Sequence, residues 1–161
     1  MGLALAQAGE AAAKDEVPVG AVIVCGDRVL GRGYNRREES QSPVAHAEIL
    51  AIEDAAGGLG SWRLSECEIY VTLEPCIMCV GAILQARIGR LVFGCLDLKA
   101  GAVESLYHLC DDARLNHRLP VVGGVLAEDC ASLLTDFFGR LREKKRDVRN
   151  TERWPSPAEG A

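Results

Sequence analysis

The sequence predicts an α/β domain with a mixed sheet of five strands. Segments with the apolar spacing of helices alternate with short β-branched runs, and two of those runs lie close enough in the chain to form a hairpin. The hairpin makes part of the sheet antiparallel. With 161 residues the chain suits one domain. We expect that domain to cover residues 1–147 and a disordered tail to follow at 148–161.

The N-terminal half begins with a predicted helix over residues 3–14, in which apolar residues surround Glu10 and Lys14. Two strands are expected at 19–24 and 29–34, joined by a tight turn at 25–28. A polar loop at 36–42 then leads to a helix over 45–56, which we expect Gly57 and Gly58 to end.

The C-terminal half continues with a strand at 69–73 and a helix from Pro75 to about Arg87, since proline fits the first turn of a helix. A strand at 90–94 follows. Residues 96–119 are polar and irregular, and a loop of that length is often functional. A fifth strand at 121–126 and an amphipathic helix over 127–145 complete the domain.

The composition is that of an ordinary globular protein, with 48% hydrophobic residues. No apolar run approaches the roughly 20 residues that cross a bilayer, and the first residues lack the basic segment of a signal peptide. We therefore expect a cytoplasmic protein with reduced thiols. Seven cysteines cannot all pair, and four of them are expected to be small buried hydrophobic residues: Cys25, Cys67, Cys110 and Cys130.

The charge is unevenly distributed. The net charge of −5 argues weakly against a nucleic-acid partner, yet residues 139–153 hold seven basic residues and three acidic ones. Two interpretations remain open for this basic segment. It is either a solvated helix end, where cations suit the helix dipole, or a surface that binds phosphate groups.

A metal site is the sharpest prediction from the residues themselves. Cys76 and Cys79 lie three apart at a predicted helix start, and His46 opens another helix 30 residues earlier. Two helix N-termini could converge on one point and favour thiolates there. One histidine and two cysteines leave the fourth position of a zinc ion open, as in catalytic sites, where a bound water has a pKa of about 7. Glu48 is the carboxylate expected to carry protons.

Each part of this site has a simpler interpretation. Cys76 and Cys79 alone could be a redox pair, and a single histidine is usually a structural residue. Cys95 is a possible extra ligand, but it follows a strand without a paired partner and is expected to be buried and inert. The combination of His46 and Glu48 with both cysteines favours a metal centre over either alternative.

These residues also carry a resemblance to a known family. The chain resembles zinc-dependent nucleobase deaminases of the cytidine/deoxycytidylate deaminase superfamily and, within them, bacterial tRNA-specific adenosine deaminases. The resemblance covers about residues 3–147. The matching stretches are VPVGAV at 17–22, GRGYN at 31–35, AHAEILAI at 45–52, YVTLEPCIMCVGAI at 70–83, RIGRLVFG at 87–94, NHR at 116–118 and Asp136-Phe137-Phe138.

The resemblance implies a fold, a reaction and partners. The fold would be a cytidine-deaminase-like three-layer α/β/α sandwich. The reaction would be hydrolysis of the wobble adenosine, position 34, of an arginine tRNA to inosine, by attack of zinc-bound hydroxide on C6. Glu48 would move the protons, and His46, Cys76 and Cys79 would hold one zinc ion per subunit. The family also implies a homodimer whose two subunits both contact the RNA.

The resemblance further implies the substrate contacts. Asn35 would hydrogen-bond the flipped base, and the pocket walls would be Val17, Ala45 and Leu73. Asp97 would lie beside the nucleotide, and Phe138 with the basic final helix would face the RNA. Three of these residues have structural alternatives: Asn35 and Asp97 could form local turns, and Phe138 could be a core residue.

Other functions stay open beside this one. A deaminase of a free base or nucleoside, of the guanine, cytosine or cytidine type, would share the fold and the zinc ligands but would need no basic segment. A non-catalytic zinc module would close its fourth ligand position and would not need Glu48. A thiol redox protein built on Cys76 and Cys79 would be active without metal.

Overall fold

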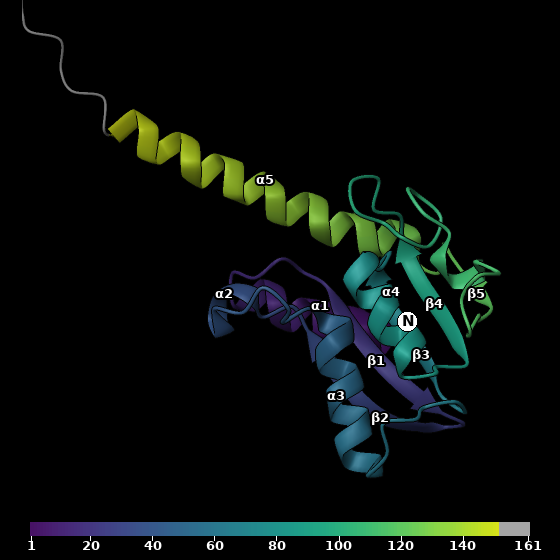
Figure 1. Ribbon diagram of the computed structural model, residues 1–161. Helices are drawn as coiled ribbons and strands as arrows, with labels where there is room; N and C mark the ends of the chain where they lie inside the picture. The colour runs from purple at the N-terminus through teal and green to yellow at the C-terminus, as the bar shows by residue number, and fades with distance from the viewer. Residues whose placement is uncertain (152–161) are drawn as a thin grey trace, which may run out of the picture.

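The computed structural model describes the backbone of residues 1–151 and the side chains of residues 1–147. A five-stranded sheet in the order β2-β1-β3-β4-β5 lies between helices on its two faces (Figure 1). Its strands are β1 Gly20–Cys25, β2 Arg28–Tyr34, β3 Glu68–Leu73, β4 Arg90–Cys95 and β5 Val121–Val122. The predicted α/β/α sandwich with a mixed sheet is confirmed.

The sheet changes from antiparallel to parallel at β3. The β1–β2 hairpin and the β1–β3 pair are antiparallel, with Ala21 opposite both Gly33 and Val71. β3–β4 and β4–β5 are parallel, with Ile69 opposite Leu91. The parallel pair places the carboxyl ends of β3 and β4 side by side, and the segments that leave those ends form part of the candidate site.

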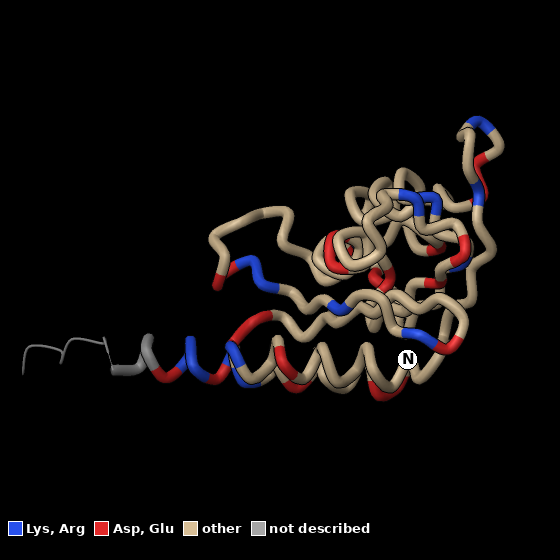
Figure 2. The backbone as a smooth tube through the Cα atoms, turned by 90° about the horizontal axis from the view of Figure 1, so that it is seen from below, with Lys and Arg blue, Asp and Glu red and all other residues tan. Residues whose placement is uncertain are grey.

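The helices form two layers. On one face, α3 (Ala47–Leu59) packs on β1 and β2 and contacts α4 (Ile77–Gln85). On the other face, α1 (Gly2–Ala13) packs on β1, and α5 (Ala127–Thr151) packs on β4. Figure 2 shows α5 running along one side of the molecule and beyond it. Two short helices are the α2 turn (Arg37–Ser40) and the 3₁₀ helix η1 (Leu109–Asp111).

The main core fills the space between the sheet and the α3–α4 layer. Its largest members include Ile23, Ile69, Leu91 and Phe93, and small alanines on α3 face them. Close approach of α3 depends on glycine in β2, because a Cβ atom at Gly33 would lie 2.2 Å from the carbonyl oxygen of Ala47. The glycine therefore sets the position of the N-terminus of α3, where two candidate site residues lie.

The predicted end of α3 and the predicted start of α4 are wrong. α3 continues through Gly57 and Gly58 and ends at Leu59, since the left-handed residue that closes it is Gly60, with φ of 67°. α4 begins at Ile77 rather than Pro75, because Cys76 is extended, with ψ of 174°, and serves as the N-cap.

The other differences lie in the loop at 36–42 and in the C-terminal third. The polar loop at 36–42 contains the single helical turn α2. The strand predicted over 121–126 is only two residues long, because Gly123 and a left-handed Gly124, with φ of 81°, turn the chain away. α5 extends past the predicted end at 145 to Thr151. Of the predicted disordered tail, residues 148–151 continue this helix, and residues 152–161 lie outside the described residues.

None of the helices in the described part of the chain combines the length and the apolar character that crossing a bilayer requires.

Candidate metal centre and pocket

Three candidate metal ligands come from the starts of two helices on the same face of the sheet. His46 is the N-cap of α3 and Cys76 is the N-cap of α4, while Cys79 lies in the first turn of α4. The carbonyl groups of both N-cap residues already accept the first helical hydrogen bonds, from Leu50 at 3.1 Å and from Val80 at 2.9 Å. Their side chains are thus free to point beyond the helix ends toward a common point.

The donor atoms are spaced as a tetrahedral metal requires. Nδ1 of His46 lies 3.8 Å from Sγ of Cys76 and 3.5 Å from Sγ of Cys79. Zinc bonds of about 2.0 Å to nitrogen and 2.3 Å to sulfur at tetrahedral angles place such atoms about 3.5 Å apart. Within the described residues, this is the one group of three His, Cys, Asp or Glu side chains whose ligand atoms all lie within 4.8 Å of one another. Cys95 is not part of it.

The three side chains share charge and protons. The hydrogen bonds from Cys79 and from His46 lower the pKa of the Cys76 thiol to about 3, so this sulfur is a thiolate. The same contact with Cys76 raises the pKa of Cys79 and that of His46. A thiolate, an imidazole and a thiol together form a set whose remaining protons a divalent cation displaces when it binds.

Glu48 is buried next to this group. It is the second residue of α3 and is 4% exposed. Burial raises the pKa of its carboxyl group, and the positive charge of His46 only partly opposes that effect. A raised pKa moves a carboxyl group toward the range that general acid–base chemistry needs, so Glu48 is suited to carry protons.

A pocket of about 240 Å³ opens over these residues. This volume lies below the roughly 300–1,000 Å³ of pockets for drug-sized ligands and suits a group such as a single base. Seven of the predicted site residues line it: Val17, Asn35, His46, Glu48, Leu73, Cys76 and Asp97. Five further lining residues were not predicted from the sequence: Val19, Arg37, Ala47, Glu74 and Ala100.

Three predicted residues lie elsewhere. Cys79 is fully buried behind the pocket wall. Ala45 is 5% exposed and does not line the pocket, although its carbonyl oxygen accepts the N–H of Arg36 at 3.0 Å. Phe138 is on α5, where it is 41% exposed and makes an edge-to-face contact with Phe137 at 5.4 Å. It is therefore a partly exposed residue outside the pocket.

The two polar substrate candidates are both held by the protein. Asn35 is 6% exposed, and its Nδ2 atom donates to Glu16 at 3.0 Å. Oδ1 of Asp97 accepts the N–H groups of Lys99 at 3.0 Å and Ala100 at 3.2 Å. Asp97 thus caps a local turn, as one interpretation of the sequence expected, and at the same time lines the pocket.

Glu74 organises the loop that bears Asp97. Its carboxylate accepts the backbone N–H groups of Asp97, Val103, Glu104 and Ser105 at 2.7–3.1 Å, and the hydroxyl of Ser105. Burial opposes the charged form, but these hydrogen bonds outweigh it and lower the pKa of Glu74 to about 2. The sequence shows only an acidic residue between a strand and Pro75, and the partners of its carboxylate lie 23 to 31 residues away.

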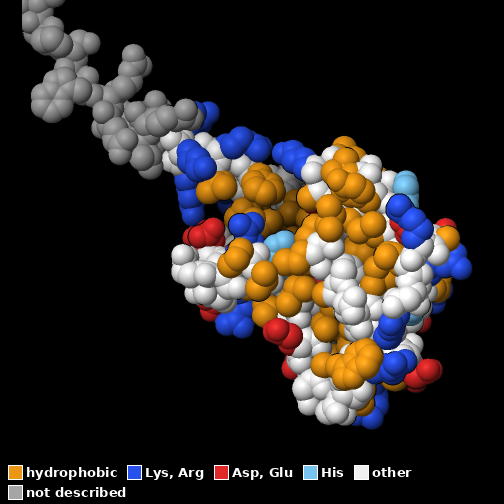
Figure 3. Space-filling view, in the orientation of Figure 1, with side chains coloured by type: hydrophobic (Ala, Val, Ile, Leu, Met, Phe, Trp, Pro, Cys, Tyr) orange, Lys and Arg blue, Asp and Glu red, His pale blue; other side chains and the backbone are white. Residues whose placement is uncertain are grey.

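Basic side chains gather on the far part of α5. Figure 3 shows them along the helix where it leaves the body of the molecule. Those with described side chains are Arg140, Arg142, Lys144, Lys145 and Arg146. Lys144 pairs with Asp15 at 3.2 Å. The side chains of Arg149 and Arg153 lie outside the described residues.

An apolar groove lies on the outer side of α3 and α4, away from the sheet. Ile49, Ile52 and Ala56 of α3 and Ala82 of α4 line it together with Trp62. Trp62 is 62% exposed, and Ile77, at the start of α4, is 53% exposed. We call these residues the α3–α4 apolar surface.

Comparison with known proteins places this geometry among deaminases. Residues 1–142 match the family model of MafB19-like deaminases. The tRNA-specific adenosine deaminase of Bacillus subtilis (strain 168) is 45% identical over 146 residues, which are 91% of each chain.

Solved structures give the same relationship. One similar structure comes from biochemical and structural studies of A-to-I editing by tRNA:A34 deaminases at the wobble position of transfer RNA. It has a TM-score of 0.80 and 45% identity, over 83% of this chain and 97% of its own. A guanine deaminase from Nitrosomonas europaea has a TM-score of 0.69 and 25% identity, over 84% of this chain and 81% of its own.

Proposed function

Because the chain belongs to the family of tRNA-specific adenosine deaminases, we propose that it hydrolyses the wobble adenosine of a tRNA, position 34, to inosine and ammonia. The observation that carries the proposal is the juxtaposition of Glu48 with the His46, Cys76 and Cys79 side chains at a pocket large enough for one base.

The proposed cofactor is one zinc ion per subunit, held by His46, Cys76 and Cys79. The fit rests on the nitrogen–sulfur distances of 3.5 and 3.8 Å and on the donor set of one imidazole and two thiols. Three protein ligands would leave one coordination position open. When bound, zinc supplies the activation of water at neutral pH.

Glu48 is the proposed proton carrier. Its buried carboxyl group, next to the ligand set, can take a proton from the attacking water and deliver it to a ring nitrogen of the base. A second transfer to the departing amino group completes the formation of ammonia. Burial raises the pKa of this carboxyl group, which favours its uptake of the proton.

The pocket walls are proposed to position the base. Val17 and Leu73 offer apolar surfaces, and Asn35 offers a carboxamide. Asp97 lines the pocket from the loop that Glu74 holds, and we propose that it lies beside the nucleotide. Ala45 does not line the pocket, and its carbonyl oxygen accepts the N–H of Arg36, the residue after Asn35.

The proposed partner is the anticodon stem-loop of an arginine tRNA. The basic side chains on α5 support this proposal, because lysine and arginine contacts to phosphates release counterions. Binding should then weaken steeply as salt rises. Phe138, partly exposed at the base of that helix segment, is proposed to contact the RNA.

A homodimer and a cytoplasmic location complete the proposal. The α3–α4 apolar surface, with Trp62 at 62% exposure, supports a contact between two copies. The seven cysteines, none of which forms a disulfide, fit a reducing compartment.

A deaminase of a free base is the second candidate. The guanine deaminase from Nitrosomonas europaea shares the fold at 25% identity, so the fold alone does not select the substrate. The test is to incubate the protein with an arginine tRNA stem-loop that carries A34 and, in parallel, with free adenosine, cytidine, cytosine and guanine. Inosine in the stem-loop alone supports the proposal, whereas ammonia from a free substrate alone would replace it with the second candidate.

A further inference from the structure

Glu16 is a buried acid that none of the steps above uses. It is 1% exposed and lies in the turn that follows α1. That turn is shaped by Asp15, which adopts a left-handed conformation with φ of 58°. Backbone N–H groups of Lys14, Asp15 and Glu16 bond back to carbonyls of α1. The helix end therefore holds Glu16 with its side chain pointing into the protein.

The carboxylate of Glu16 joins two segments at the pocket. Its Oε2 atom accepts a hydrogen bond from Nδ2 of Asn35 at 3.0 Å, and its Oε1 atom accepts one from the backbone N–H of Glu39 at 2.7 Å. Asn35 follows β2 and lines the pocket, and Glu39 belongs to the α2 turn, which carries the lining residue Arg37.

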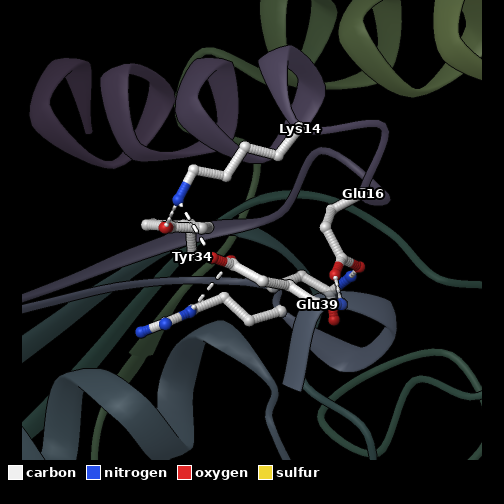
Figure 4. A network of polar contacts seen from close by, with 6 residues as sticks. Lys14, Glu16, Tyr34 and Glu39 are labelled. Atoms are coloured by element: carbon white, nitrogen blue, oxygen red, sulfur yellow. Dashed lines mark hydrogen bonds and ion pairs between the residues drawn. The ribbon is translucent and has the colours of Figure 1, made fainter. Parts of the chain in front are cut away.

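Further contacts hold the α2 turn from its other side. Figure 4 shows Glu16 pointing toward Glu39, beside the contacts that link Lys14, Tyr34 and Glu39. The carboxylate of Glu39 pairs with Lys14 at 3.3 Å and with Arg36 at 3.2 Å. Glu16 is thus the buried member of a cluster whose other carboxylate lies near the surface.

The chemistry of Glu16 determines the orientation of the Asn35 amide. A carboxylate accepts hydrogen bonds and does not donate them, so it requires the NH₂ group of Asn35 on its side. The flipped amide would place two acceptor oxygens together in a buried position, which is unfavourable. The pocket is left with the Oδ1 acceptor and the second N–H of Asn35 in a fixed arrangement.

We propose that Glu16 is a positioning residue, which acts through Asn35 to set the hydrogen-bond pattern that the pocket offers to the base. The proposal rests on the proposed function, in which Asn35 contacts the base. A fixed amide distinguishes a base with an amino substituent from one with an oxo substituent, because the amino group donates a hydrogen bond and the oxo group accepts one. A base that leaves a buried polar group of the pocket without its partner reacts more slowly.

The test is a double-mutant cycle with Glu16→Gln, Asn35→Ala and the double variant. Glutamine keeps the shape but offers one acceptor in place of two. Initial rates on the A34 stem-loop give kcat and KM, and bound metal and Tm are measured on each variant. Glu10→Gln, which changes an exposed acid on the preceding helix α1, is the matched control, and its kinetics should equal those of the unmodified protein.

The proposal expects Glu16→Gln to lower kcat/KM by about tenfold or more, as the loss of a hydrogen bond to a charged group implies. The double variant should fall within about twofold of Asn35→Ala, since a residue that acts through another adds no loss once its partner is gone. Bound metal should stay unchanged.

Three results would overturn it: full kcat/KM in Glu16→Gln, losses that multiply in the double variant, or loss of metal from Glu16→Gln. Should Glu16→Gln fail to fold, Glu16→Asp enters the same cycle, because it keeps the carboxylate but shortens its reach. If the unmodified protein acts on a free base instead of the stem-loop, the proposed function fails, and the cycle is measured on that base with the same expectations.

Discussion

Replacing Glu74 with glutamine should loosen the loop that brings Asp97 to the pocket. The Glu74 carboxylate accepts four backbone N–H groups and the Ser105 hydroxyl, and Glu74 is 2% exposed. Glutamine keeps one acceptor oxygen and turns the other position into a donor. At least one buried N–H group, that of Asp97 or one of the three at 103–105, would then face a donor.

The size of the effect follows from these contacts. A hydrogen bond to a charged group contributes about 1.5–3 kcal/mol, and a buried unsatisfied donor costs about 1–3 kcal/mol. We therefore expect Glu74→Gln to lower the free energy of unfolding by about 3 kcal/mol. The lowered pKa of Glu74, about 2 against an ordinary 4.5, corresponds to a similar preference for the charged carboxylate, about 3 kcal/mol.

The assay is urea unfolding followed by circular dichroism, together with hydrogen exchange of the backbone amides in the 97–105 loop. Glu104→Gln is the matched control, because its side chain is exposed in the same loop, and we expect a change within about 0.5 kcal/mol. A Glu74→Gln protein as stable as that control, with protected amides at 97, 104 and 105, would refute the reasoning.

Three further substitutions test the site and its support. Glu48→Ala should lower kcat by about 10²–10⁴-fold with metal and fold retained, since it removes the proton carrier; turnover near the original rate would remove Glu48 from that role. Cys76→Ala should lose bound metal in elemental analysis while Cys95→Ala keeps it, and full metal in Cys76→Ala would strike this cysteine from the ligand set. Gly33→Ala should lower the free energy of unfolding by about 1–3 kcal/mol, because the new Cβ would meet the Ala47 carbonyl oxygen at 2.2 Å. The control is Gly9→Ala, where the new Cβ has open space around it. Equal stability of the two variants would contradict the packing argument.

Local patterns in the sequence predict most of the fold, because each strand or helix carries its own periodicity. The β1–β2 hairpin and the alternation of helix and strand needed no tertiary information. The boundaries that failed depend on backbone conformation. Gly57 and Gly58 look like a helix end, yet the left-handed cap falls at Gly60. Pro75 suits a first helical turn. However, Cys76 is extended and serves as the N-cap, so the helix begins at Ile77.

The metal ligands could be predicted because their residue types and helix-start positions are visible in the sequence. Glu16 and Glu74 could not, since their importance comes from partners 19 to 31 residues away that only the folded chain brings together. An acid beside an apolar run reads as a surface residue until the backbone N–H groups that surround it are known.

The most direct measurement is to treat a full-length arginine tRNA that carries adenosine at position 34 with the protein and to map inosine along the RNA by nuclease digestion and mass spectrometry. The account predicts inosine at position 34 alone, formed about 10²-fold or more slowly by the Glu48→Ala variant. Inosine at other adenosines with none at 34, or no inosine alongside release of ammonia from a free base, would contradict it.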